Sequence, residues 1–176
     1  MKNMIVWLFP ILFMFHDFEE IIFIKPWTAK NAERLRNKYP ALSEGLLRQF
    51  VSVSTSAFSL GVAEEFILIS TVTIAAYLTG WYYLWLGGFI AFTLHLIAHC
   101  VQALMLKGYV PAFFTSILTL PLCCYCVVLF LQRYQPAMGQ TIIFSVVGIV
   151  IMVVNLLVVH KAMTKFDRWL NQYQKL

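Results

Sequence analysis

The chain has 176 residues, of which 61% are hydrophobic and only 12% are charged, and its mean hydropathy is +0.78. This composition is far too apolar for a water-soluble globular domain of that length. The net charge of +5 comes from Lys and Arg residues that flank the apolar stretches. It therefore indicates a membrane face and excludes a nucleic-acid-binding surface.

Five apolar stretches reach the ~20 residues that a helix needs to cross a ~30 Å hydrocarbon core. They are residues 3–24, 52–79, 81–106, 111–132 and 139–160. The runs lack the alternation of a transmembrane β-strand, and no small-residue cleavage site follows the first one, as a signal peptide would require. The sequence predicts an all-α, polytopic membrane bundle of about five transmembrane helices, which forms one integral membrane domain over residues 1–176.

The distribution of Lys and Arg predicts the orientation of the bundle. With five spans, all but Lys2 and Arg133 of the 13 Lys and Arg residues fall on the side that carries the C-terminus. Positive residues are enriched in cytoplasmic loops, so we expect the N-terminus outside and the C-terminus in the cytoplasm. On that side the basic residues would meet anionic lipid headgroups.

The longest polar segment, residues 25–50, is predicted to form a cytoplasmic, interfacial helical hairpin. Thr28 and Ser43 are the expected N-caps of its two short helices. Tyr39 and Pro40 mark the break between these helices.

Acidic residues lie inside the predicted spans, where a carboxylate near a helix centre costs ~2.5–3.5 kcal/mol. The first three spans hold no Lys or Arg beyond Lys2, but they do hold three histidines, His16, His95 and His99. Intramembrane ionisable residues of this kind indicate a functional site. Of the eight Asp and Glu residues in the chain, the ones inside spans are Asp17, Glu19, Glu20, Glu64 and Glu65.

The second and third spans are predicted to bring acids and histidines to one depth. A very tight turn is expected at Gly80, so that the two spans run antiparallel as a hairpin. In that hairpin Glu64 and Glu65 lie level with the segment between His95 and His99. These four residues are therefore expected to lie close together.

The first span is predicted to add residues at the same depth. At ~1.5 Å per residue, His16 and His95 each lie ~21 Å from the outer boundary of the membrane. His16, Glu19 and Glu20 stand at i, i+3 and i+4, and His95 and His99 stand at i and i+4, so each set shares one helix face.

We interpret this convergence as a metal site for one ion or two. Imidazole and carboxylate groups form a donor set suited to iron, zinc or manganese, and a bound cation would offset repulsion among the acids and keep the imidazoles neutral. The two remaining glutamates, Glu19 and Glu64, are the expected catalytic residues. The expected metal ligands are His16, Glu20, Glu65, His95 and His99.

Other interpretations of the acids stay open. They can be protonated and hydrogen-bonded within the bundle, as in a structural subunit, or they can form a proton or cation relay with the histidines. A transporter of only five helices would need a homodimer for alternating access. The cysteines of PLCCYC in the fourth span are expected to be inert packing residues.

Several motifs together resemble those of a known family. The chain holds HDFEE at 16–20, AEE at 63–65, HLIAHCVQ at 95–102 and GYVP at 108–111. This combination resembles the HXXEE-motif family of small bacterial membrane proteins, and the resemblance covers nearly the whole chain. It implies a location in the bacterial inner membrane, and it brings no established reaction with it.

Two enzyme classes fit a metal site of this composition. One is an oxidase or hydroxylase, such as a di-iron enzyme that acts on a lipid chain between the helices. The other is a hydrolase in which a spare glutamate acts as the general base. Intramembrane proteases with an EExxxR motif belong to the second class, but here Glu64 and Glu65 are followed by FILI without an Arg, which disfavours a protease.

Overall fold

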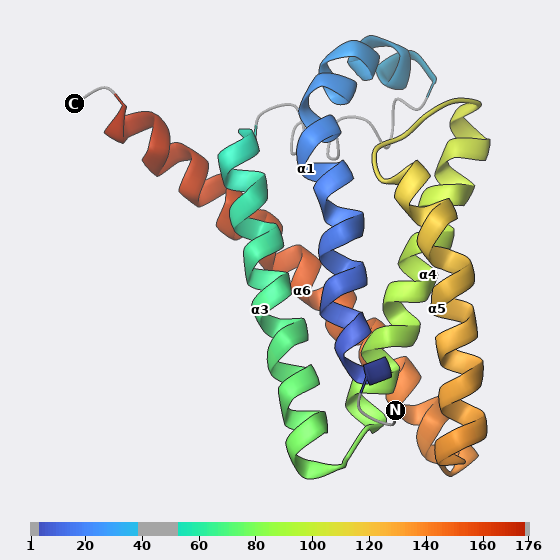
Figure 1. Cartoon of the computed structure of the whole chain (residues 1–176). Coiled ribbons are helices and arrows are strands. Elements are labelled where there is room, and N and C mark those ends of the chain that lie inside the picture. Colours follow the sequence, from blue (N-terminus) through green and yellow to red (C-terminus); the bar gives the residue numbers. More distant parts are fainter. Residues whose placement is uncertain (1–3, 39–52, 175–176) are drawn as a thin grey trace.

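The structure, a computed structural model, describes residues 4–38 and 53–174. Over these residues it contains helices and no strand (Figure 1). The prediction of an all-α fold is thereby confirmed. The helices are α1 (Met4–Lys38), α3 (Thr55–Thr79), α4 (Tyr83–Leu106), α5 (Phe113–Tyr134) and α6 (Met138–Tyr173).

Helices α3, α4, α5 and α6 are long and apolar enough to cross a membrane. Many large apolar side chains on the outside of the bundle are exposed, among them Ile67, Leu104 and Leu118. Such a surface is typical of contact with lipid rather than with water. Helix α1 carries Asp17, Glu19 and Glu20 in its apolar half and is not in that group, so its crossing of the membrane stays a prediction, as does the orientation of the bundle.

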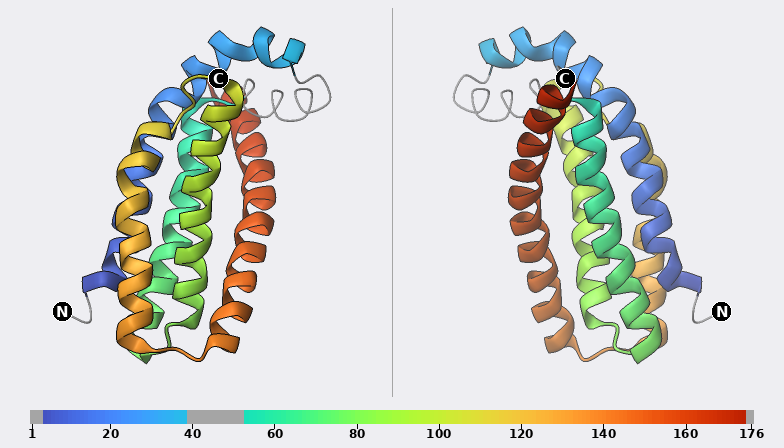
Figure 2. Two further views of the ribbon diagram at one scale, coloured as in Figure 1. Left: turned by 90° about the vertical axis from the view of Figure 1, so that its right-hand side faces the viewer. Right: turned by 90° about the vertical axis from the view of Figure 1, so that its left-hand side faces the viewer.

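Helix α1 is longer than the sequence predicts, because it does not end at residue 24 but continues to Lys38. Pro26 lies inside it, and a proline can bend a helix without ending it. Figure 2 shows that the second half of α1 turns aside and lies across the end of the bundle. The prediction that Thr28 is an N-cap is wrong, because its hydroxyl donates to the carbonyl of Ile24 within the helix at 2.5 Å.

The other helix bounds are close to the predicted ones, except that α6 runs past residue 160 to Tyr173. The expected tight turn after α3 is present at Gly80, which has a left-handed conformation (φ 71°) that suits glycine. Its N–H donates to the carbonyl of Ala76 at 3.0 Å. The expected N-cap Ser43 and the expected break at 39–40 lie outside the described residues.

An aromatic core joins α1 to α4 and leads to the histidines. The indole N–H of Trp85 donates to the carbonyl of Val6 at 3.1 Å, and Phe9 packs against Phe92 at a ring-centroid distance of 5.7 Å. The rings of Phe92 and His16 meet edge to face, with their centroids 5.8 Å apart. These contacts turn the His16 face of α1 toward α4.

Helices α4 and α6 cross in close backbone contact. A Cβ atom added to Gly148 would overlap the backbone of Gly87, and one added to Gly87 would overlap the carbonyl of Phe144. Small residues at such crossings allow helix backbones to approach closely in membranes. The crossing holds α6 against the helix that carries His95 and His99.

We expect Gly148→Ala to lower the stability of the bundle by about 3 kcal/mol, at the upper end of the cost of overpacking. The matched control is Gly139→Ala, because a Cβ at Gly139 meets no atom within 4 Å. Thermal unfolding in detergent measures the difference. Equal melting temperatures for the two variants would contradict the close crossing.

Candidate metal centre

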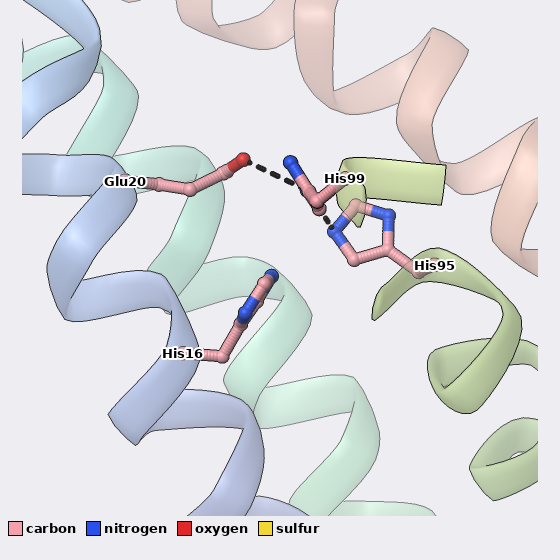
Figure 3. Close-up of side chains that lie close together, drawn as sticks. All are labelled: His16, Glu20, His95 and His99. Carbon is pink, nitrogen blue, oxygen red and sulfur yellow. Dashed lines mark hydrogen bonds and ion pairs between the residues drawn. The ribbon is translucent and has the colours of Figure 1, made fainter. Parts of the chain in front are cut away.

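Four side chains from two helices meet inside the bundle (Figure 3). His16 and Glu20 come from α1, and His95 and His99 come from α4. Each offers one nitrogen or oxygen atom, and these four atoms all lie within 4.8 Å of one another. The structure therefore brings together four of the five predicted metal ligands in a group that could hold a metal ion.

Two separations between donor atoms suit ligands of a single cation. His99 Nε2 lies 3.0 Å from His95 Nε2 and 3.2 Å from Glu20 Oε1. Two ligands on one metal with bonds of ~2.0–2.1 Å lie ~2.9 Å apart at right angles and ~3.3 Å apart at the tetrahedral angle. The observed separations fall within this range.

Hydrogen bonding orients His16. The hydroxyl of Thr115 donates to Glu19 Oε2 at 2.7 Å and lies 3.3 Å from His16 Nδ1. A hydroxyl has one hydrogen, so the oxygen that donates to Glu19 accepts the Nδ1–H of His16. This tautomer leaves a lone pair on His16 Nε2, an atom that is buried and without a hydrogen-bond partner.

Glu19 is held at the beginning of α5. Its carboxylate accepts hydrogen bonds from the backbone N–H of Phe114 at 3.3 Å and of Thr115 at 2.7 Å. The hydroxyl of Tyr109 donates to it as well, at 2.9 Å. Burial and this hydrogen bond raise the pKa of Tyr109, which keeps the hydroxyl protonated as a donor. Glu19 thus acts as a cap on a neighbouring helix.

The two glutamates of α3 point in different directions. Glu65 is half-buried and lines the same pocket as Glu20, His95 and His99, although it lies outside the four-residue group. Glu64 is exposed and accepts a hydrogen bond from Asn155 of α6 at 3.1 Å. Both predicted catalytic residues lie outside the four-residue group, although Glu19 is linked to His16 through Thr115. Their catalytic roles stay predictions.

The centre lies at a pocket of about 520 Å³. Residues from α1, α3, α4 and α6 line it, and most of them are apolar, such as Trp27, Phe58 and Met163. Asp17 also lines this pocket; it is only 3% exposed, and its Oδ2 has no hydrogen-bond partner. The pocket therefore combines an apolar wall with polar groups that converge at one place, as is typical of a ligand site.

Sequence reasoning missed Thr115 and Tyr109. Both donate hydrogen bonds to Glu19, but neither belongs to a motif that contains acidic residues. A threonine in an apolar helix carries no signal that distinguishes it from a packing residue. The GYVP turn that contains Tyr109 was the only available pointer.

We expect Glu19→Ala to destabilise the protein by about 2 kcal/mol, because backbone N–H groups at the beginning of α5 lose their acceptor in a buried place. Glu33→Ala is the matched control, since Glu33 is an exposed glutamate beyond the apolar half of α1, and we expect it to change stability by less than about 0.5 kcal/mol. Thermal unfolding of both variants in detergent tests this. A Glu19→Ala protein as stable as the control would rule out the capping role.

Comparison with known proteins identifies the family of the chain. No curated protein and no solved structure shows significant similarity to it. A family model described as "Protein of unknown function with HXXEE motif" matches residues 7–126. This match covers well over half of the chain and includes all four residues of the candidate centre. The protein belongs to the HXXEE-motif family.

Proposed function

We propose that the protein is a membrane metalloenzyme that binds one metal ion through His16, Glu20, His95 and His99. The observation that carries this proposal is that His16 Nε2 is buried without a hydrogen-bond partner. The tautomer inferred from the contact with Thr115 leaves a lone pair on this atom. The ring of His16 faces the other three side chains in Figure 3. A buried polar atom without a partner is costly, and a cation at the centre of the group would satisfy it.

Hydrogen bonding alone does not account for the group. His99 Nε2 lies close to both His95 Nε2 and Glu20 Oε1, but a neutral imidazole has only one N–H to donate. If His99 Nε2 carries that hydrogen, it can donate to only one of the two neighbours, and the other lies close to it without a hydrogen bond. A cation accepts lone pairs from all of them at once, which favours a metal over protonated, hydrogen-bonded acids.

Three imidazoles and one carboxylate suit zinc, iron or manganese. Such an ion supplies Lewis-acid chemistry, or redox chemistry if it is iron or manganese. Metal-binding histidines commonly donate their other ring nitrogen to a nearby oxygen, which fixes the tautomer. Thr115 provides that oxygen for His16, and Glu19 holds Thr115 in place.

The substrate that fits this pocket is a lipid or another apolar molecule. The wall of the pocket is mainly apolar, and the outer faces of the surrounding helices are apolar as well. We propose that a molecule dissolved in the bilayer enters between the helices and reaches the centre without crossing water. We propose that the protein resides in the cell membrane, with its basic residues against anionic headgroups.

Hydrolysis is the reaction that the geometry supports best. Glu65 lines the pocket without belonging to the four-residue group, so its carboxylate is available to accept a proton from an attacking water as a general base. Oxidation is the second candidate, because the donor set also suits iron. The identity of the bound metal separates the two: zinc favours hydrolysis, and iron favours oxidation.

We expect protein purified in detergent to contain about one metal ion per chain by elemental mass spectrometry, since one group of four donors is present. His99→Ala and Glu20→Gln should each reduce that content at least tenfold, and Glu64→Gln should leave it unchanged because Glu64 lies outside the group. Metal-free wild-type protein would favour the relay or structural interpretations instead. Full occupancy in either ligand variant would remove that residue from the centre.

Thr115→Val should weaken metal binding 10–100-fold, because loss of an outer hydrogen bond to a histidine ligand has an effect of that size. Thr115→Ser keeps the hydroxyl and should restore binding. The matched control is Thr119→Val, one turn further along α5, where the hydroxyl donates only to the helix backbone. Competition with a chelator of known affinity measures the change. Equal affinities for Thr115→Val and Thr119→Val would show that Thr115 does not orient His16.

A further inference from the structure

A second cavity adjoins the candidate metal centre. It measures about 180 Å³ and lies between α1, α3, α4 and α6. Glu65, His95 and Leu156 line both this cavity and the larger pocket, so the two meet beside the centre. The second cavity extends along α4 from His95 to Gly88 and Leu84, that is, toward the turn between α3 and α4.

The wall of the second cavity is almost entirely apolar. Beyond Glu65 and His95, its one polar side chain is Asn155, whose amide already donates to Glu64. The other lining residues are apolar, among them Phe13, Val72 and Met152. A polar or charged group placed there would lose its hydrogen bonds with water and find no replacement. Only a hydrocarbon suits such a wall.

We propose that this cavity, here named the tail cavity, holds the hydrocarbon chain of a single-chain lipid substrate whose polar part occupies the larger pocket. The inference rests on the proposed function, because it takes the metal centre as the place of reaction. The reacting bond then lies beside Glu65 and His95, between the two cavities. Ile151 on the wall of the tail cavity is 41% exposed, so the cavity borders the lipid-facing surface from which such a chain would come.

The length of the tail cavity predicts the length of the chain. Leu84 is the lining residue of α4 nearest the turn between α3 and α4. With its side chain as the end wall, the open length runs from His95 to Gly88, which are seven residues or ~10 Å of helix apart. An extended hydrocarbon advances ~1.3 Å per carbon, given bonds of ~1.5 Å. The tail cavity therefore accommodates about eight carbons beyond the reacting position.

Gly88 determines the width of the tail cavity near its end. A Cβ atom at Gly88 would lie 3.3 Å from the ring of Phe9, so a larger side chain there fills the space between α1 and α4. Leu84 lies one turn further on. Removing its side chain lengthens the tail cavity without touching the centre.

Linear alkyl hydroxamates of four to fourteen carbons test this proposal, because a hydroxamate head binds metal ions and the alkyl tail can enter the tail cavity. Binding to metal-loaded and to metal-free protein in lipid nanodiscs is measured by calorimetry, with empty nanodiscs as the reference for partition into lipid. Referred to the free hydroxamate in water, each added methylene should strengthen binding about fourfold, as expected for ~0.8 kcal/mol per CH₂ removed from water. The gain should stop at about eight carbons.

Two variants decide whether the tail cavity sets that limit. Gly88→Leu should move the chain length at which the gain stops to fewer carbons, and Leu84→Ala should move it to more. If one variant does not fold, the other still tests the proposal. Gly139→Leu is the control, because Gly139 has no neighbour within 4 Å of an added Cβ and lies outside both cavities. It should keep the wild-type limit.

The outcomes separate this inference from the proposed function. If hydroxamates bind only to metal-loaded protein but the limit is the same in Leu84→Ala, Gly88→Leu and the control, the tail cavity is not the chain site and the metal centre stands. If the limit moves as expected but binding does not depend on metal, the chain site stands and the metalloenzyme proposal fails.

Discussion

The hydrogen bonds from the beginning of α5 through Glu19 and Thr115 to His16 are the constraint on which the centre depends. Backbone N–H groups at a helix end have no partner within the helix, and an apolar environment offers no water to satisfy them. Glu19 supplies the acceptor. The same contacts fix α5 beside α1 and set the tautomer of His16, so one carboxylate serves both packing and the site.

This arrangement explains the spacing of the HXXEE motif. His16 and Glu20 are four residues apart and share one helix face, and both contribute to the four-residue group. Glu19 points ~100° away from Glu20 around the helix, toward α5 instead of α4. The two glutamates of the second pair also have different roles, because Glu65 lines the pocket and Glu64 accepts a hydrogen bond from Asn155 of α6. In each pair one glutamate faces the centre and the other joins helices.

Much of this could be predicted from the sequence. Apolar runs predicted the helices, and the tight turn at Gly80 together with helical spacing predicted that His16, His95 and His99 converge. Charge alone could not divide the roles of Glu19 and Glu20, because that depends on where the beginning of α5 lies. The end of the apolar run at residue 24 predicted the end of the first helix, but the helix bends and continues to Lys38. The close crossing at Gly87 and Gly148 and the tail cavity arise from packing between distant segments, which residue patterns along one helix do not reveal.

The central claim is that one cation binds between α1 and α4. X-ray absorption spectroscopy of the metal in the purified protein tests it most directly, because the spectrum reports the ligand atoms around the ion. We expect three imidazole nitrogens and a carboxylate oxygen at ~2.0–2.2 Å, with fewer imidazoles in His16→Ala. A spectrum without imidazole ligands, or one that His16→Ala leaves unchanged, would contradict the account.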